Sequence, residues 1–246
     1  SSAASDVYKR QHQGEGPLNE YINSIAAFSQ NAVSVSAGNE GTARHHYMKT
    51  LTAVNMRDTI ELRVGEKESI RGFMLEFWGD SPNFYSMTIQ SPAGEQLSVS
   101  TSLKNSIQEL SFVFVETKVL VNYVPIERRT GNTLIFIRFL HPAVGIWKFL
   151  VGERIPGESR FHMWLPVRGM ISDDTYFLEP SPEYTITSPG DAADAMTATA
   201  YQYRDNSLYV QASRGYNTEN VVKPDFAAPG VCLLYTSPSP RDISGS

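Results

Sequence analysis

The residues with the clearest chemical potential form the stretch 33–41, Val-Ser-Val-Ser-Ala-Gly-Asn-Glu-Gly. Alternating valines and serines that lead into Ala37 and Gly38 are typical of a short buried strand. Such a strand delivers one polar side chain, that of Asn39, at its carboxyl end. Ligands of open α/β sheets bind outside the carboxyl ends of the strands, so this amide is well placed to meet one. The structural alternative is that Asn39 merely caps a turn.

Helical and extended segments on both sides of this stretch complete an α/β pattern. Segment 17–28 predicts a helix, because it begins with proline and places apolar residues on one face. From residue 180 onward, short strands are expected at 184–187, 195–201 and 207–210, with a turn or cap at 190–194. Lys223-Pro224-Asp225 is expected to fix a loop rather than to take part in chemistry.

Two motifs connect this pattern to a known family. Residues 36–41, Ser-Ala-Gly-Asn-Glu-Gly, resemble the oxyanion-hole segment of the subtilisin-type serine peptidases. Residues 223–231, Lys-Pro-Asp-Phe-Ala-Ala-Pro-Gly-Val, resemble the family's segment just before its nucleophile. On these motifs the chain is identified as a member of that family. It is similar to the germination-protease-like subtilases of spore-forming anaerobes, which carry an inserted jelly-roll or β-sandwich domain.

The resemblance implies acyl transfer, which needs a nucleophile, a base and donors for the developing oxyanion. By resemblance, the Asn39 amide supplies the oxyanion donor, and Ser36, Ala37 and Gly38 form one wall of the primary specificity pocket. The family's motifs around its catalytic Asp, His and Ser are absent from the chain. We therefore expect a fragment of a serine endopeptidase that is inactive as given. Peptides or proteins would be its substrates.

The middle of the chain, 51–167, has a different pattern of apolar and polar residues. Alternating segments separated by Gly, Pro and Asn predict an antiparallel sandwich, with strands at 58–64, 72–78, 85–90, 111–115, 119–123, 134–139 and 145–151. A final alternating segment at 161–165 makes His162 a structural residue. The expected fold class is thus a partial subtilisin-like α/β domain with an inserted antiparallel β-sandwich. Its aromatic residues could line a carbohydrate or peptide groove, but core packing is the favoured interpretation for Trp78, Phe84, Tyr85, Trp147 and Trp164.

No metal ligands are assigned, and no cofactor is predicted to be required. His45 and His46 invite a metal interpretation, but no third ligand follows at a recognised spacing, so a polar loop over 42–47 is favoured. Calcium, which the family often uses, is left open without an assigned site. Asp173 and Asp174 could bind it, although two acidic residues are commoner at the start of a helix or turn.

The charge and composition of the chain exclude some classes of binding partner. A net charge of −5 with scattered lysines and arginines argues against nucleic acid, and no apolar run is long enough to span a membrane. With 41% hydrophobic and 19% charged residues, the chain is globular rather than disordered. A secreted or spore-associated location is expected from the resemblance.

The expected domain plan divides the chain into five segments. Residues 16–50 and 168–231 form the peptidase-like domain around the sandwich at 51–167, whereas 1–15 and 232–246 contain adapter-like artefactual ends. Two alternative functions stay open. One is a pseudoprotease scaffold of the same family, and the other is a non-enzymatic binding module built on the sandwich.

Overall fold

The computed structural model describes residues 17–28, 31–101, 107–128, 130–216 and 221–231. The expected artefactual ends, 1–15 and 232–246, lie outside these residues. Contacts divide the chain into two units. The parallel-sheet unit comprises Ser1–Thr42 and Pro182–Ser246, and the sandwich unit comprises Ala43–Ser181.

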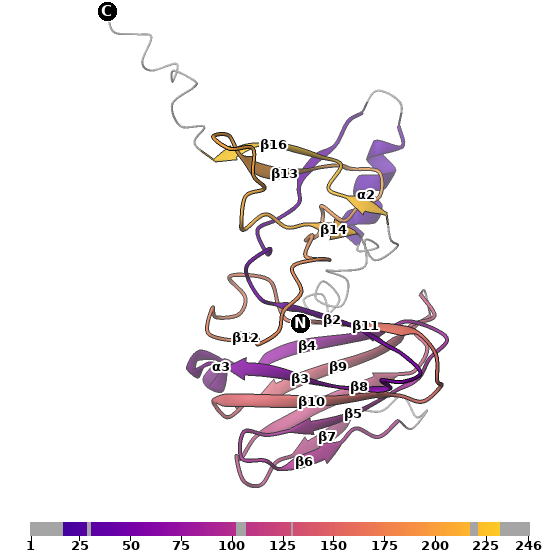
Figure 1. Ribbon diagram of the computed structural model, residues 1–246, viewed down its shortest axis with the longest axis vertical. Coiled ribbons are helices and arrows are strands. Elements are labelled where there is room, and N and C mark those ends of the chain that lie inside the picture. Colours follow the sequence, from indigo (N-terminus) through magenta and orange to yellow (C-terminus); the bar gives the residue numbers. More distant parts are fainter. Residues whose placement is uncertain (1–16, 29–30, 102–106, 129, 217–220, 232–246) are drawn as a thin grey trace, which may run out of the picture. The chain divides into compact units, whose positions relative to one another are not determined.

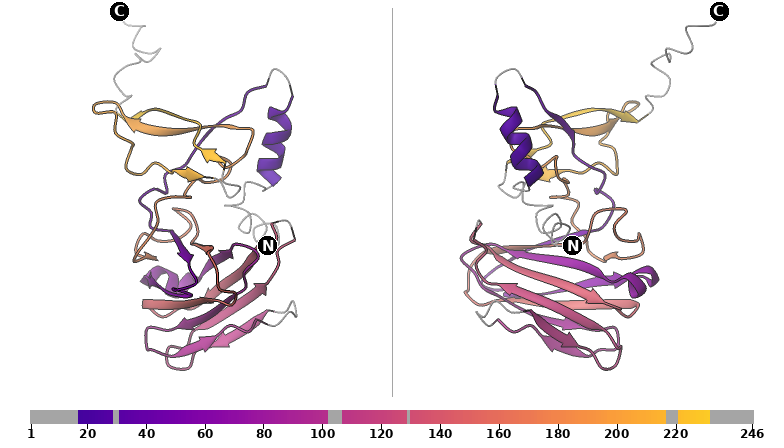
Figure 2. Two further views of the ribbon diagram at one scale, coloured as in Figure 1. Left: turned by 45° about the vertical axis from the view of Figure 1, so that its right-hand side comes forward. Right: turned by 180° about the vertical axis from the view of Figure 1, so that it is seen from behind.

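The sandwich unit consists of two antiparallel sheets, seen as separate layers in Figure 1 and Figure 2. The five-stranded sheet has the order β12-β3-β10-β5-β6, and the six-stranded sheet has the order β2-β11-β4-β9-β8-β7. This confirms the antiparallel sandwich expected for the middle of the chain. The strands are β2 (His46–Leu51), β3 (Arg57–Val64), β4 (Phe73–Gly79), β5 (Tyr85–Gln90), β6 (Gln96–Ser98), β7 (Gln108–Ser111), β8 (Lys118–Val124), β9 (Thr133–Leu140), β10 (Gly145–Glu153), β11 (Ser159–Trp164) and β12 (Tyr176–Phe177).

One continuous apolar core lies between these sheets. Alternate residues of each strand point into it, as in β5, where Tyr85, Met87 and Ile89 are buried while the residues between them are half-buried. Trp147 is fully buried and meets the ring of Phe139 edge-on. No larger residue fits at Gly79, because a Cβ there would overlap the ring of Tyr85.

Of the five aromatic residues considered for a groove, Tyr85 and Trp147 belong to this core. Trp78 and Trp164 are also buried, but on the opposite face of the six-stranded sheet, because their strand neighbours Phe77 and Met163 face the core. Phe84 is 36% exposed. Burial of these side chains favours the packing interpretation over a carbohydrate groove.

Two local predictions in the sandwich unit were wrong. Segment 111–115 is not a strand, because β7 ends at Ser111 and a turn follows in which Glu116 has a φ of 50°. Segment 42–47 is not simply a polar loop, because β2 begins at His46. The strand forms there because β2 pairs with β11, a strand that lies far away in the sequence.

A turn at 172–175 packs on the short helix α3 (Glu66–Arg71), and the two predicted acidic residues lie in it. The buried carboxylate of Glu68 accepts hydrogen bonds from the backbone N–H of Ser172 (3.0 Å) and the hydroxyl of Thr175 (2.7 Å). Asp174 also accepts a hydrogen bond from the Ser172 hydroxyl, which lowers the pKa of this carboxyl. The predicted turn start is thus present at Asp173–Asp174.

The parallel-sheet unit contains the helix α2 (Pro17–Ala26) and a parallel sheet in the order β1-β13-β16. Its strands are β1 (Ser34–Ser36), β13 (Met196–Gln202) and β16 (Phe226–Val231), and a small antiparallel pair is formed by β14 (Gly215–Tyr216) and β15 (Val222–Lys223). A parallel sheet with a helix was predicted and is present. The described residues form only these elements of it, not a complete subtilisin-like α/β core.

Two strands predicted for this unit are absent from the described residues. Segment 184–187 is irregular because Tyr184 has a φ of 57°, and its backbone bonds to Arg214 and Ala37 rather than to a ladder. Segment 207–210 makes one bridge, between Leu208 and Tyr201, and no strand.

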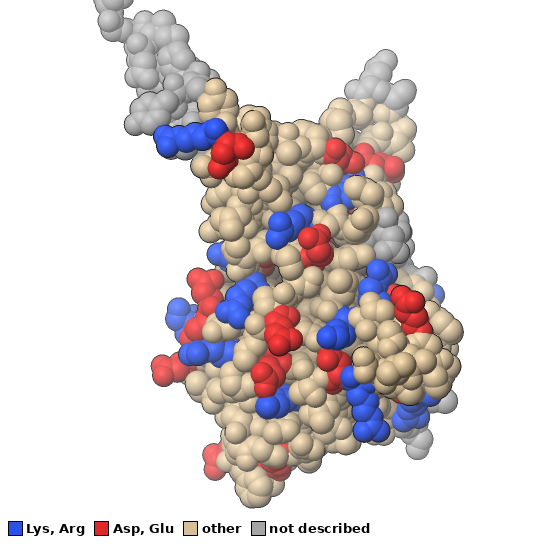
Figure 3. Space-filling view, in the orientation of Figure 1, with Lys and Arg blue, Asp and Glu red and all other residues tan. Residues whose placement is uncertain are grey.

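The surface drawn in Figure 3 mixes both signs of charge over the sandwich unit, and the described residues on that face form no single-sign patch. Neither described helix has the length or the hydropathy to cross a bilayer.

The predicted insertion, 51–167, differs in extent from the sandwich unit. β2 and β12 both pair with sandwich strands, so residues 43–50 and 168–181 belong to that unit.

Candidate functional site

The structure places Asn39 just beyond the carboxyl end of β1. β1 lies parallel to β13, and the backbone N–H of Ala37 donates to the carbonyl of Ala198 (2.9 Å), which extends the pairing by one residue. Ala37 is buried, whereas Ser36 and Asn39 are exposed. The four predicted site residues therefore lie together at the strand end, with the Asn39 side chain on the surface. Their catalytic roles stay predictions.

Small residues at 37 and 38 let a second loop approach the end of β1. The backbone N–H of Thr187 donates to the carbonyl of Ala37 (3.0 Å). Gly38 has a φ of 105°, and a Cβ there would lie 2.5 Å from Thr187 Oγ1. A side chain at Gly190 would likewise lie 2.6 Å from the carbonyl oxygen of Ser36. Close packing therefore requires glycine at both positions, and at Gly38 the backbone angle requires it as well.

The turn that carries Asn39 is fastened to residues 211–213. The backbone N–H of Gly41 donates to the carbonyl of Gln211 (3.0 Å). The N–H of Glu40 donates to Ser213 Oγ (2.9 Å), and the N–H of Ser213 donates to the carbonyl of Gly38 (3.1 Å). A side chain at Gly41 would overlap the carbonyl of Ala212. These bonds hold the backbone on both sides of Asn39.

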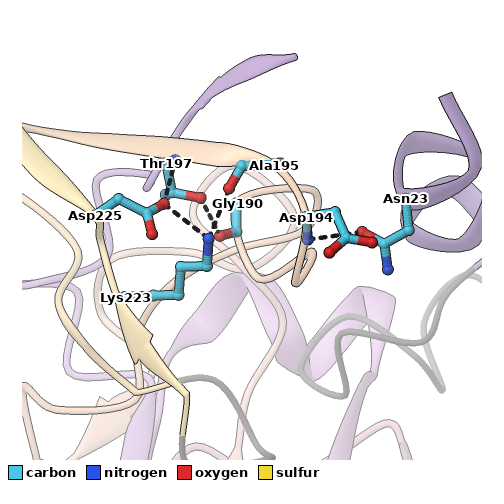
Figure 4. Close-up of polar contacts among 7 residues, drawn as sticks. All are labelled: Asn23, Gly190, Asp194, Ala195, Thr197, Lys223 and Asp225. Carbon is cyan, nitrogen blue, oxygen red and sulfur yellow. Dashed lines mark hydrogen bonds and ion pairs between the residues drawn. The ribbon is translucent and has the colours of Figure 1, made fainter. Parts of the chain in front are cut away.

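A buried lysine joins the beginnings of β13 and β16 (Figure 4). Lys223 Nζ donates to the carbonyl of Ala195 (2.6 Å) and to Asp225 Oδ2 (2.7 Å). The same carboxylate oxygen accepts the backbone N–H of Thr197 (2.6 Å). Burial raises the pKa of Asp225, but the hydrogen bonds from Lys223 and Thr197 and the lysine charge outweigh it and hold the pKa below its usual value. Lys223 thus fixes a loop, the role expected of its motif.

Helix α2 is attached to the loop before β13 by buried amide contacts. Asn19 is fully buried, and its Nδ2 donates to Asp191 Oδ1 (2.8 Å) while its Oδ1 accepts from the hydroxyl of Ser188 (2.8 Å). Asn23 Oδ1 accepts the backbone N–H of Asp194 (3.1 Å), which Figure 4 shows beside the lysine cluster. The helix therefore packs through polar bonds as well as through Ile22.

The sequence prediction missed these buried polar residues. Asn19 lies three positions before Ile22, so it shares the inward face of α2, and this spacing was a signal that went unused. No pattern in the sequence connects Ser213 to Glu40, which lies 173 residues away.

His45, His46 and His162 belong to the sandwich unit. His46 and His162 are buried on neighbouring strands with their ring nitrogens 3.0 Å apart, and both rings stack on Trp164. Among the described residues, no three His, Cys, Asp or Glu side chains come together as metal ligands. His162 is structural, as expected, and His46 shares that role. Calcium binding stays a prediction without a site.

Comparison with known proteins finds a likeness among solved structures. No protein-family model matches the chain, and no curated protein matches it. Among solved structures, the chain is similar to the CspB protease of Clostridium perfringens, with a TM-score of 0.77 and 26% sequence identity. The similarity covers 89% of this chain and 45% of that chain, so this chain spans less than half the length of the protein it resembles.

These findings correct the identification made from the two motifs. A chain that belongs to the subtilisin-type peptidases is expected to match a model of that family, and this chain matches none. Membership is therefore not supported. What is supported is a fold similar to that of a clostridial protease.

Proposed function

We propose that this chain is part of a serine endopeptidase in which the Asn39 amide stabilises the developing oxyanion. The observation that carries the proposal is the position of Asn39, exposed at the carboxyl end of a parallel strand on a turn fixed by three hydrogen bonds. The likeness to a protease over 89% of the chain supports it.

The physical basis is preorganisation. Attack on a peptide carbonyl moves negative charge onto its oxygen, and an amide N–H that already points there lowers the barrier without reorganising. Such a donor is useful only if its backbone is held in place. The hydrogen bonds from residues 211–213 hold the backbone at Gly38, Glu40 and Gly41, and so meet this requirement.

Substrate binding is assigned to the residues before Asn39. Ser36, Ala37 and Gly38 are small, so their backbone can be approached closely by an extended peptide. The proposed substrate is a protein or peptide, and the proposed mechanism passes through an acyl-enzyme. The nucleophile and its base are assigned to other parts of the complete polypeptide. On this proposal, the 246-residue chain by itself is inactive.

The test compares the complete polypeptide that contains this chain with the 246-residue chain alone. Both are incubated with a library of internally quenched peptides and with a fluorophosphonate probe that labels activated serines. The complete polypeptide is expected to cleave peptides and to carry the probe on one serine, and the chain alone is expected to do neither. A complete polypeptide that neither cleaves nor reacts would overturn the proposal. Probe on a serine of residues 17–231 would contradict the assignment of the nucleophile.

A further inference from the structure

Ser213 makes contacts with both peptide groups that flank Asn39. Its backbone N–H donates to the carbonyl of Gly38 (3.1 Å), and its hydroxyl oxygen accepts the N–H of Glu40 (2.9 Å). The first bond fixes the peptide plane before the Asn39 Cα, and the second fixes the plane after it. Because peptide groups are planar, fixing both sets the direction in which the Asn39 side chain leaves the backbone.

Ser213 is itself held by the sheet. It is fully buried, and its carbonyl oxygen accepts the hydroxyl of Thr199 (3.2 Å), a residue of β13. Its hydroxyl also packs against Gly38, where a Cβ would lie 3.0 Å from Ser213 Oγ. A side chain at position 38 would press on this hydroxyl and separate the two segments. Ser213 therefore transmits the position of β13 to the turn that carries Asn39.

Only one of these bonds depends on the side chain at 213. Any residue there could donate its backbone N–H to Gly38, but the acceptor for Glu40 is the serine hydroxyl. Without it, a buried backbone N–H loses its acceptor, and the peptide plane after Asn39 is free to rotate.

We propose that Ser213 is a positioning residue that aims the Asn39 amide, an inference that rests on the proposed oxyanion role of Asn39. Ser213 touches neither substrate nor reacting atoms, and acts through the backbone of residues 38–40. Its loss leaves the amide present but misdirected, so it slows turnover less than loss of the amide itself.

The first test uses the 246-residue chain and does not depend on activity. The Glu40 backbone amide and the Asn39 side-chain amide are followed by NMR in the native chain, S213A, S213T and S188A. Ser188 is a matched control, because its hydroxyl also makes one bond within the parallel-sheet unit, to Asn19. S213A is expected to speed exchange of the Glu40 N–H about tenfold and to shift the Asn39 amide signals. S213T keeps a hydroxyl and should restore both, whereas S188A should change neither. Native Asn39 signals in S213A, or equal shifts in S188A, would overturn the proposal.

The second test uses the complete polypeptide and separates the two proposals. S213A is expected to lower kcat by about 10- to 100-fold with KM little changed. If N39A lowers kcat and S213A does not, the oxyanion role stands and the positioning role fails. If N39A has no effect on kcat, the proposed function fails first, whatever S213A does.

Discussion

The two units of this chain differ in the size of the apolar core inside each. The sandwich unit has one large apolar core that joins both sheets, with Trp147 and Phe149 completely buried. The apolar cluster of the parallel-sheet unit comprises Ile22, Ala192 and Ala195 with two half-buried valines. Around this small cluster the unit also buries hydrogen-bonded polar side chains, among them Asn19, Asp191, Ser213 and Lys223.

The difference fits the role proposed for Asn39. Apolar packing is non-directional and stabilises in proportion to the area removed from water. Hydrogen bonds contribute less net free energy, because folding exchanges them for bonds to water. Their strict geometry, however, fixes the direction of a backbone. The bonds that hold the turn around Asn39 are therefore of the kind that can orient a side chain. The large apolar core of the sandwich unit contributes stability without setting such a direction.

The largest effect is expected in the sandwich core. W147A removes a fully buried ring that Phe112 and Phe139 meet edge-on, and should destabilise the unit by about 3–5 kcal/mol. Urea unfolding followed by tyrosine fluorescence and circular dichroism measures it. V113A, at a side chain that is 74% exposed, is the control and should cost well under about 1 kcal/mol. Equal effects of the two would refute the assignment of Trp147 to the core.

A smaller loss of stability is expected when the buried lysine, Lys223, is replaced. K223M leaves the carbonyl of Ala195 without its donor and Asp225 without its cation, and should cost about 1–3 kcal/mol. The matched control is K148M, because Lys148 pairs with Glu61 at the surface with both side chains more than a third exposed. That change should cost about 0–1 kcal/mol. Exchange of the Thr197 amide reports the difference locally, and unchanged exchange in K223M would contradict the role given to Lys223.

The smallest expected effect on stability depends on pH and comes from Tyr85. Burial raises the pKa of Tyr85 to about 12, although its hydrogen bonds oppose the shift. The folded state thus holds the phenol proton more tightly than the unfolded state, where the pKa is about 10. The resulting stability is present below pH ~10 and is lost as pH rises toward 12.

The variant Y85F isolates this contribution, because Tyr47 and Tyr123 also have pKa values raised by burial and are unchanged in it. Between pH 8 and pH ~11, native stability in urea should fall by about 1 kcal/mol more than that of Y85F. Parallel pH profiles for the two proteins would show that the Tyr85 phenol is not protected in the core.

Sequence reasoning succeeded where the signal was local. Alternation predicted β9 and β10 almost to their ends, and Ala37-Gly38-Asn39 identified a strand end with an exposed amide. It failed where residues far apart in the sequence determine the local structure. β2 was missed because His45, His46 and Tyr47 look polar, yet pairing with β11 buries them.

The buried polar bonds of the parallel-sheet unit escaped prediction for the same reason. Asn19 and Asp191 are 172 residues apart, and hydrophobic periodicity gives no information about such a pair. Threonine and isoleucine at 184–187 indicated a strand, but the left-handed backbone of Tyr184 and its bonds to a neighbouring loop prevent one. At this segment, tertiary contacts therefore override the local propensity to form a strand.

The central claim is that the Asn39 amide stabilises charge in the transition state, and kcat of N39A in the complete polypeptide tests it most directly. Loss of one preorganised oxyanion donor should lower kcat by about 10²–10³-fold and leave KM nearly unchanged, since the donor acts mainly in the transition state. A kcat within about threefold of the native value, with the fold intact, would contradict the claim.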